Sequence, residues 1–549
     1  MPDETPDLHG AFPRLSEAHL TQLEAQGERR RVAQGDVLFR EGDTGYDFYV
    51  VLDGLIAIIA SHGHEDERAF AVHGPGRFLG ELGLLSGQAA FFTAVAATDA
   101  QVLAVPVQRI RDLVARDEGL GDLLLRAYLM RRDMLIEFGA GFRIVGASRS
   151  ADVRRLREFA ARNRLPHTWI PHERTDPIVL WGEKVLHNPS NGELAAAIGL
   201  RDRTCAVPDG DLIIVGAGPA GLAASVYGSS EGLNTLCVDA IATGGQAATS
   251  SRIENYLGFP SGLSGGELAE RARIQAEKFG ARIMVPAEVT ALERRDERYV
   301  VTLDDGAELS APTVVIASGV RYRRLDVPKL MQFESTCVYY AATRMEAQLC
   351  VSEPVAVVGG GNSAGQAAVF LSQRASTVHL IVRDELGRDM SQYLVDRLRD
   401  TPSVEIHEHT EIMELEGDEL LEAVIVADTL TGERRRLAVR HLFIFIGAEP
   451  HTDWLGDLVA LDDEGYVLTG RDVGATRDGH DPLMLETSLP GVFAAGDVRH
   501  RAIKRVASAV GEGSMAVRMV HEHLTATGSE PQAATPVPAP APAKAKASA

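Results

Sequence analysis

The chain has 549 residues, of which 45% are hydrophobic and 24% charged, with a formal net charge of -22. This length exceeds what one hydrophobic core supports, so we expect three or four domains of ordinary globular composition. The acidity argues against nucleic acid or an anionic membrane as the main partner. The four scattered cysteines form no Cys-x-x-Cys pair, and neither a signal peptide nor a membrane span is indicated. We therefore expect a cytoplasmic protein.

Residues 1–138 predict an all-β roll followed by helical segments. Strand-like stretches at 48–52, 55–59 and 101–105 are separated by glycine turns, and apolar periodicity predicts helix over 110–138. The order of Gly42-Asp43, Asp53-Gly54 and Gly80-Glu81-Leu82 resembles the cyclic-nucleotide-binding domain. In that family the Gly-Glu turn holds the cyclic phosphate and a ribose hydroxyl. The resemblance implies a nucleotide-like pocket formed by Gly80, Glu81, Leu82 and Thr93.

One position departs from the family pattern. The family carries an arginine just before a Thr/Ser-Ala pair, where this chain has Phe92 before Thr93-Ala94. A phosphate that faces phenylalanine loses a charge-assisted hydrogen bond worth about 1.5–3 kcal/mol. We therefore favour a degenerate sensor or assembly module. The alternative, a reductase gated by cyclic AMP, requires measurable affinity for cyclic AMP.

Residues 139–203 predict a small α/β domain. The expected elements are strands at 142–146, 167–170 and 176–180 and helices at 151–163 and 191–200, the last opening at a capping-type Asn191-x-Glu193. This order resembles a glutaredoxin-like domain of the thioredoxin fold, with Pro177 at the position of the family's cis-proline. The turn that carries cysteines in that family reads Ser148-Arg149-Ser150, so thiol–disulfide exchange cannot occur there. We interpret the segment as a docking or spacer domain.

The first of two glycine-rich loops follows an apolar run at 212–215. The motif Gly216-Ala217-Gly218-Pro219-Ala220-Gly221 predicts a strand, a tight turn and a helix whose N-terminal amides face a pyrophosphate. Asp239 ends the next predicted strand, where a carboxylate accepts a hydrogen bond from a ribose hydroxyl. Strand, turn, helix, strand and acid occur in the expected order, which predicts a dinucleotide site.

The second loop follows the apolar run at 355–358. Its residues Gly359, Gly361, Asn362, Ser363 and Ala364 predict a second dinucleotide cradle. The next predicted strand ends in Arg383-Asp384, with Arg388 close behind. The two arginines favour the 2'-phosphate of NADPH, whereas Asp384 leaves NADH possible.

Residues 204–526 resemble the thioredoxin reductase family of flavoproteins. The resemblance lies in the two loops, Gly244-Gly245-Gln246-Ala247, the segment 253–258, the strand at 314–319 and the motif at 491–498. It implies FAD at the first loop and NADPH at the second. The implied flavin contacts beyond the loop are Gly245, Gln246, Asn255, Gly319, Gly496, Asp497, Arg505, Val506 and Ala507.

The redox-active cysteines of that family are absent. Alignment on the segment 338–346 puts Ala341 and Arg344 at the two sulfur positions. A dithiol relay needs two sulfurs that can bond, so this route is closed. Cys337 and Cys350 flank the segment; whether they can form a redox pair is left open, although packing as small apolar residues is the preferred interpretation.

The expected fold is a β-roll, a small thioredoxin-like α/β domain and two Rossmann-like α/β domains of the thioredoxin reductase type. The expected domains are 1–138 (roll), 139–203 (thioredoxin-like), 204–322 and 440–526 (FAD-binding), 323–439 (NAD(P)-binding) and a disordered tail at 527–549.

The expected function is an FAD-dependent oxidoreductase that takes hydride from NADPH. The sequence does not decide which electron acceptor is used: the candidates are oxygen, a quinone or dye, the redox centre of another protein, and an unidentified disulfide. The alternative is a sensor or scaffold with little turnover. We expect a homodimer, by analogy with the scaffold, and no catalytic side chain. We also expect no metal, since His407 and His409 beside Glu405 are interpreted as a charged, solvated face.

Overall fold

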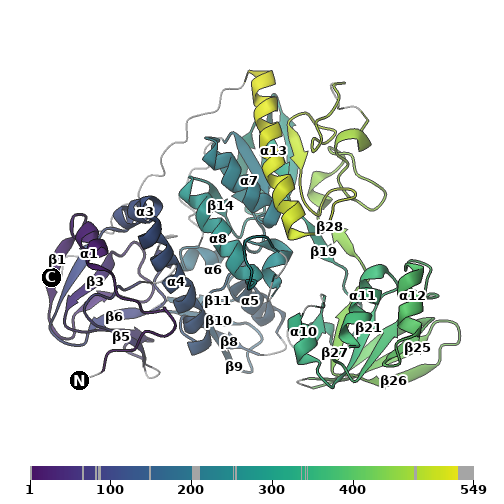
Figure 1. The fold of residues 1–549 in the computed structure, drawn as a ribbon, viewed down its shortest axis with the longest axis horizontal. Helices are drawn as coiled ribbons and strands as arrows, with labels where there is room; N and C mark the ends of the chain where they lie inside the picture. The colour runs from purple at the N-terminus through teal and green to yellow at the C-terminus, as the bar shows by residue number, and fades with distance from the viewer. Residues whose placement is uncertain are drawn as a thin grey trace.

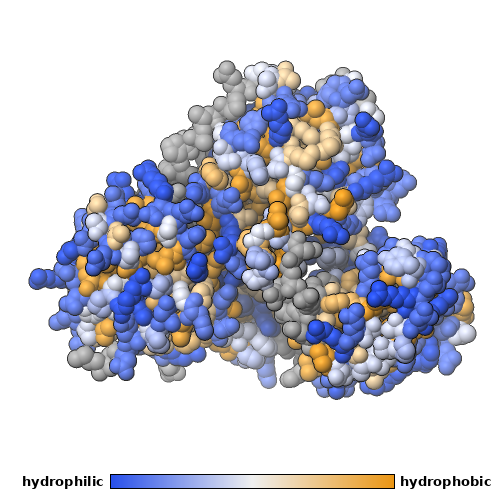
Figure 2. Space-filling view, in the orientation of Figure 1, coloured by the Kyte–Doolittle hydropathy of each residue, from blue (hydrophilic) through white to orange (hydrophobic). Residues whose placement is uncertain are grey.

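The computed structural model describes residues 3–528, apart from 65–66, 81–82, 85–87, 148–149, 183, 201–209, 251–252, 254–255, 335–336, 341, 343, 419, 475 and 477–478. Four parts follow along the chain (Figure 1): a β-roll, a small α/β domain, a large α/β domain and a second α/β domain inserted into it. Hydrophilic side chains cover most of the visible face of the roll and of the inserted domain (Figure 2). Among the described residues, no helix combines the length and apolarity needed to cross a bilayer.

The described part of the roll contains two antiparallel sheets and the helices α1, α3 and α4. The sheets have the orders β1-β7-β3 and β2-β6-β4-β5. The elements are α1 (Glu17–Glu24), β1 (Glu28–Val32), β2 (Val37–Phe39), β3 (Phe48–Asp53), β4 (Ile56–Ala60), β5 (Arg68–His73), β6 (Thr93–Ala96), β7 (Ala100–Val105), α3 (Val107–Arg116) and α4 (Glu118–Phe138). The predicted strands are confirmed. The predicted helical segment is divided at Asp117, whose side chain caps α4 by accepting a hydrogen bond from the amide of Leu120.

The small domain has a four-stranded sheet of order β11-β10-β8-β9. Strands β8 and β9 are parallel, whereas β10 is antiparallel to both β8 and β11. The elements are β8 (Phe142–Gly146), α5 (Ala151–Arg162), β9 (His167–Pro171), β10 (Ile178–Trp181), β11 (Lys184–His187) and α6 (Asn191–Ala197). Two local expectations were wrong. The only cis peptide among the described residues is Val285–Pro286, so Pro177 is not a cis-proline, and α6 is capped by Ser190 in a capping box with Glu193 rather than by Asn191.

The roll and the small domain share one hydrophobic core. Phe91 of the roll lies 5.1 Å from Trp181 of β10 between ring centroids, and the amide of Ala89 donates to the carbonyl of Ile198 at 3.0 Å. Because buried aromatic pairs add to the hydrophobic stabilisation, these two parts form one N-terminal unit.

The large α/β domain is built on a parallel sheet of order β14-β13-β12-β18-β29. Its central strands are buried along their whole length, as is typical of a sheet covered on both faces. The elements are β12 (Leu212–Val215), α7 (Pro219–Ser230), β13 (Thr235–Val238), α8 (Gly265–Lys278), β14 (Arg282–Met284), β15 (Val289–Arg295), β16 (Arg298–Leu303), β17 (Glu308–Ala311), β18 (Thr313–Ile316), β29 (Val492–Ala494) and α13 (Val506–Thr527). The predicted strand–turn–helix–strand order is confirmed.

The inserted domain is joined to the large domain by a two-stranded ribbon of β19 (Val320–Tyr322) and β28 (Ala448–Pro450). Its parallel sheet has the order β20-β27-β21-β22-β23, beside an antiparallel sheet of β24, β25 and β26. The elements are β20 (Val338–Tyr339), α10 (Arg344–Leu349), β21 (Pro354–Val358), α11 (Asn362–Leu371), β22 (Thr377–Ile381), α12 (Gln392–Arg399), β23 (Val404–His407), β24 (Thr410–Gly417), β25 (Leu421–Asp428), β26 (Arg434–Ala438) and β27 (His441–Ile444). The chain therefore contains two sheets of the dinucleotide-binding type.

Candidate functional site

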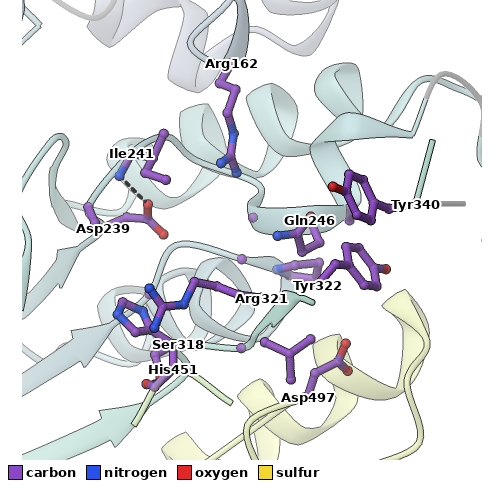
Figure 3. A pocket seen from close by; sticks show the side chains of 18 of the residues that line it. Arg162, Asp239, Ile241, Gln246, Ser318, Arg321, Tyr322, Tyr340, His451 and Asp497 are labelled. Carbon is purple, nitrogen blue, oxygen red and sulfur yellow. Dashed lines mark hydrogen bonds between the residues drawn. The ribbon is translucent and has the colours of Figure 1, made fainter. Parts of the chain in front are cut away.

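A cavity of about 2370 Å³ lies where the large domain, the small domain and the inserted domain meet. Most of the residues that the sequence assigns to the first dinucleotide line it, and Figure 3 labels Asp239, Gln246 and Asp497 among them. They are Gly216, Gly218, Pro219, Ala220, Asp239, Gly245, Gln246, Gly319, Gly496, Asp497, Arg505, Val506 and Ala507. Asn255 lies outside the described residues.

The first glycine loop is shaped by close backbone contacts. A Cβ on Gly221 would lie 1.8 Å from the carbonyl oxygen of Gly216, so only glycine lets α7 approach its strand this closely. Gly218 is different: the nearest atom to its Cβ position is 3.9 Å away, on the cavity side. No side chain caps α7, so its first amides are available to an anion.

The carboxylate of Asp239 accepts hydrogen bonds from the backbone of this loop and of the segment that follows β13. One oxygen accepts from the amide of Ala217 at 2.9 Å, and the other accepts from the amides of Ile241 and Ala242 at 2.9 and 3.1 Å. A carboxylate has about four acceptor positions, so Asp239 can still accept a hydroxyl hydrogen bond at the cavity wall.

A second helix N-terminus faces the same cavity. Helix α13 begins at Val506 after Arg505, and no side chain caps it. Asp497 lies near this end (Figure 3), where burial raises the pKa of its carboxyl, with Lys504 acting in the opposite direction. Two uncapped helix N-termini in one cavity are suited to a ligand that carries phosphate and electron-rich ring groups.

The second glycine loop lies on the inserted domain, away from this cavity. Gly359 has a φ of +142°, and a Cβ there would lie 2.3 Å from the carbonyl oxygen of Phe445. Gly361 precedes α11 with no atom within 4 Å of its Cβ position, and no side chain caps this helix either. The side chain of Asn362 accepts from the amide of Ser391 at 2.8 Å and so fixes the neighbouring loop. Beside it, Ser363 is exposed and Ala364 is buried.

The two arginines assigned to a 2'-phosphate differ in their surroundings. Arg388 forms an ion pair with Asp384 at 3.1 Å. Arg383 is exposed and has no ion-pair partner among the residues that the structure describes. Arg383 is therefore the better placed of the two to meet an added phosphate.

Sequence reasoning missed an aromatic pair on the cavity wall. Tyr322 of β19 and Tyr340 stack with ring centroids 5.9 Å apart at an interplanar angle of 10°. The hydroxyl of Tyr340 donates to Glu334 at 2.5 Å, and burial raises the pKa of this hydroxyl. Tyr340 immediately precedes Ala341, so aromatic rings line the cavity next to the position of the family's first sulfur. Ala341 itself lies outside the described residues, and Arg344 begins α10.

Sequence reasoning also missed a cation from the small domain. Arg162 ends α5, and Figure 3 shows its side chain reaching toward the cavity between Asp239 and Gln246. The next residue, Asn163, donates from its side chain to the carbonyl of Ile241 at 2.9 Å. Because Arg162 lies far from the glycine loops in the sequence, no motif could indicate it.

No disulfide joins the three cysteines that the structure describes. Cys237, Cys337 and Cys350 are free and buried. Burial raises the pKa of both Cys237 and Cys350 to about 12, so each remains a thiol at neutral pH. Cys205 lies outside the described residues.

Only part of the nucleotide-like pocket of the roll can be described, because Glu81 and Leu82 are not among the residues that the structure describes. Gly80 has a φ of +102°, and Thr93 is 3% exposed and accepts from the amide of Glu41 at 3.1 Å. Phe92 is buried and lies 5.6 Å from Phe39 between ring centroids. An apolar ring therefore stands beside Thr93, where the family keeps a cation.

Two known protein families match the chain, one over the region that contains both glycine loops and the other over the roll. Residues 210–513, more than half of the chain, match the family model "Pyridine nucleotide-disulphide oxidoreductase", and residues 29–117 match "Cyclic nucleotide-binding domain". The chain therefore belongs to the pyridine nucleotide-disulphide oxidoreductase family.

Individual relatives are thioredoxin reductases. The chain is 33% identical to the thioredoxin reductase of Treponema pallidum over 316 residues, 58% of this chain and 97% of the relative. It is 35% identical to that of Yarrowia lipolytica over 314 residues, 56% of this chain and 95% of the relative. A solved thioredoxin reductase from Streptococcus pyogenes is 31% identical, covers 58% of this chain and 98% of its own, and has a TM-score of 0.47.

The protein is accordingly a thioredoxin reductase-like FAD-dependent NAD(P)H oxidoreductase with an N-terminal cyclic-nucleotide-binding domain. The family uses FAD and NADPH, as the sequence predicts. The regulatory alternative without turnover is not favoured by these relatives.

Proposed function

We propose that this protein delivers electrons from NADPH to an acceptor without a protein dithiol. The observation that carries the proposal is the substitution of alanine and arginine at positions 341 and 344, together with the burial of the described cysteines. FAD, when bound, accepts hydride from a nicotinamide and releases electrons by its own chemistry, so the protein must supply mainly binding and orientation.

We assign the large cavity to FAD. The amides at the start of α7, next to Gly218, hold the pyrophosphate, Asp239 accepts from a ribose hydroxyl, and the amides at the start of α13 face the ring system. Arg162 supplies a cation from the small domain. The open space beside Gly218 and Gly319, where no neighbouring atom would block a ligand, fits a group that approaches the backbone closely.

We assign the second glycine loop to NADPH. The open position at Gly361 and the uncapped start of α11 suit a pyrophosphate, and Arg383 suits the 2'-phosphate. This preference rests on Arg383, which has no ion-pair partner within the described part of the chain, so it predicts that NADH is a weaker donor.

The acceptor meets the cavity where Tyr322 and Tyr340 stack. Flat aromatic rings favour a flat aromatic partner such as a quinone, because offset stacking stabilises aromatic pairs by about 0.5–1.5 kcal/mol. A protein disulfide would instead require a thiolate to attack it, and no described cysteine lies on the cavity wall.

The N-terminal unit is proposed to be a cyclic-nucleotide-like roll without cyclic AMP affinity and a thioredoxin-like domain without redox function. The sheet order β11-β10-β8-β9 and the parallel β8–β9 pair support the thioredoxin-like assignment. Buried Phe92 supports the loss of cyclic AMP binding. Calorimetry with cyclic AMP tests it: no heat is expected, and saturable binding would contradict the proposal.

Steady-state turnover of the purified holoenzyme with a panel of acceptors tests the function. We expect NADPH consumption with quinones that is unchanged when all four cysteines are replaced by alanine, and no thioredoxin reduction. Loss of quinone turnover in the cysteine-free variant would contradict the proposal, provided that its flavin absorbance and unfolding midpoint match those of the wild type.

A further inference from the structure

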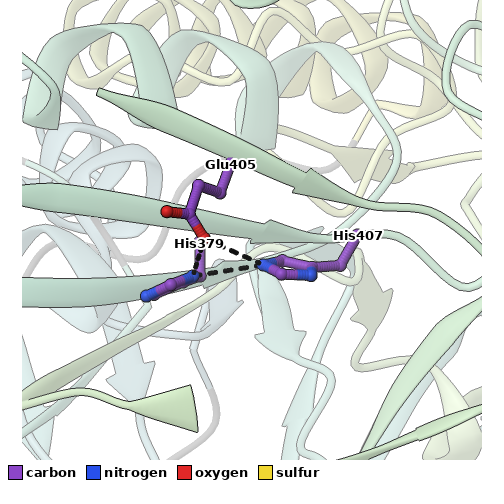
Figure 4. A group of neighbouring side chains, drawn as sticks. All are labelled: His379, Glu405 and His407. Carbon is purple, nitrogen blue, oxygen red and sulfur yellow. Dashed lines mark hydrogen bonds and ion pairs between the residues drawn. The ribbon is translucent and has the colours of Figure 1, made fainter. Parts of the chain in front are cut away.

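Three potential metal-ligating side chains converge at the edge of the inserted domain (Figure 4). His379 lies on β22, and Glu405 and His407 lie on the edge strand β23. The parallel register pairs His379 with Glu405, and His407 follows two residues later on the same face. Sequence reasoning interpreted His407 and His409 as one solvated face; instead, β23 ends at His407, whose side chain is only 11% exposed.

The distances between the candidate ligand atoms are short. Nδ1 of His379 lies 3.1 Å from Nε2 of His407 and 3.3 Å from Oε2 of Glu405. Nε2 of His407 lies 4.0 Å from the same carboxylate oxygen. The three candidate ligand atoms therefore lie within 4.8 Å of one another.

These separations match a metal centre. Metal–nitrogen bonds of about 2.0–2.1 Å in a tetrahedral zinc site separate neighbouring ligand atoms by roughly 3.3 Å. Two of the observed edges lie close to this value, and a small rotation of Glu405, whose side chain is 57% exposed, would shorten the third. The neutral imidazole ring offers one nitrogen lone pair to a metal.

Two histidines and one carboxylate are a donor set suited to zinc and its neighbours among the divalent transition metals rather than to calcium or magnesium. The cluster is half open, because the side chains of the two histidines are 12% and 11% exposed, whereas that of Glu405 is 57% exposed. Arg435 of β26 is the nearby positive charge that acts against a bound cation.

We propose that His379, Glu405 and His407 bind one divalent transition-metal ion, with zinc as the best match and water as the fourth ligand. The ion joins β22 to the edge strand β23. Because β22 leads into Arg383 at the second glycine loop, the ion also stiffens the strand end that carries this arginine. The ion is structural in this proposal and takes no part in hydride transfer.

Zinc titration of the full-length, FAD-loaded protein, purified without a histidine tag and stripped with a chelator, tests the proposal. Competition with a chromogenic chelator measures affinity, and thermal unfolding measures the stabilisation by zinc. We expect one tight zinc per chain and a rise in melting temperature. Since even outer-shell changes weaken metal sites by about 10–100-fold, we expect H379Q and H407Q each to weaken binding by about 100-fold or more.

A matched control uses His62 in the roll, whose Nδ1 pairs with Oε2 of Glu67 at 3.0 Å. H62Q should leave the zinc affinity unchanged. If a histidine variant fails to fold, E405Q changes an exposed side chain and should still weaken zinc binding by about tenfold. No tight zinc in the wild type, or equal affinity in H62Q, E405Q and the folded histidine variants, would overturn the proposal.

Discussion

The guanidinium of Arg131 on α4 donates a hydrogen bond at 2.9 Å to the carbonyl oxygen of Gly80 in the roll. The next residue, Arg132, donates to the carbonyl of Arg164 in the small domain at 3.2 Å and to the side chain of Gln88 in the roll at 3.3 Å. Its charge also acts on Glu270 of α8 in the large domain. Helix α4 therefore contacts Gly80 of the roll and Arg164 of the small domain through adjacent residues.

The stability of the roll should depend on pH through His73. This side chain is buried beside Arg77 and Arg131, and burial, with the two arginines, lowers its pKa well below the usual value. The unfolded chain takes up a proton below about pH 6.5, whereas the folded chain does not, so stability is lost as the pH falls below that value. The expected slope is up to about 1.4 kcal/mol per pH unit.

Denaturant unfolding at a series of pH values measures this effect. In H73L the free energy of unfolding should fall less steeply as the pH is lowered below about 6.5. The control H64L, which changes an exposed histidine, should show the same pH dependence as the wild type. A wild-type slope that persists in H73L would contradict the assignment.

Arg273 should be a major stabilising residue of α8. It bridges Glu270 at 2.6 Å and Glu277 at 2.7 Å, and its own side chain is 11% exposed. R273A leaves two carboxylates without their cation, and loss of one partner from a buried pair costs about 3–5 kcal/mol. R271A is the control on the same helix, since its pair with Glu267 is 39% and 34% exposed and is worth less than about 1 kcal/mol. An equal loss of unfolding free energy in R273A and R271A would contradict the prediction that the Arg273 pairs contribute more than the Arg271 pair.

Arg162 should contribute to flavin retention although it belongs to the small domain. A charge-assisted hydrogen bond to an anionic cofactor is worth about 1.5–3 kcal/mol, so R162A should weaken FAD binding by roughly 10–150-fold. R109A removes the same charge from the exposed surface of α3 and should have no effect. Flavin fluorescence on dilution measures both. Unchanged retention in R162A would show that the small domain does not complete the site.

Arg383 should set the choice of nicotinamide donor. R383A removes the exposed cation at the end of β22 and should raise the KM for NADPH by about tenfold or more, with little change for NADH. R399A, at the end of α12 on the same domain, is the matched control. If R383A changes the KM for NADPH and for NADH equally, Arg383 does not determine the donor preference.

Most of the fold could be predicted from local sequence patterns. Gly216, Gly221 and Asp239 could be predicted because a strand, a glycine turn and a helix adjoin in the chain, and the packing that requires them is local. The cap of α6 was misplaced by one residue, because Ser190 and Asn191 are both good capping residues and only the backbone decides between them.

The unpredicted parts depend on contacts between distant segments. Arg162 reaches the cavity because the small domain docks beside Asp239, and His379 meets His407 from 28 positions away across a strand register. No periodicity or motif in one stretch of sequence encodes either placement.

Anaerobic reductive titration with NADPH tests the central claim most directly. A reductase with both a flavin and a redox disulfide takes up four electrons, whereas a flavin alone takes up two. We expect full bleaching of the flavin at one equivalent of NADPH per FAD, and the same endpoint in the cysteine-free variant. An endpoint at two equivalents in the wild type that falls to one in the cysteine-free variant would reveal a working thiol couple and contradict the account.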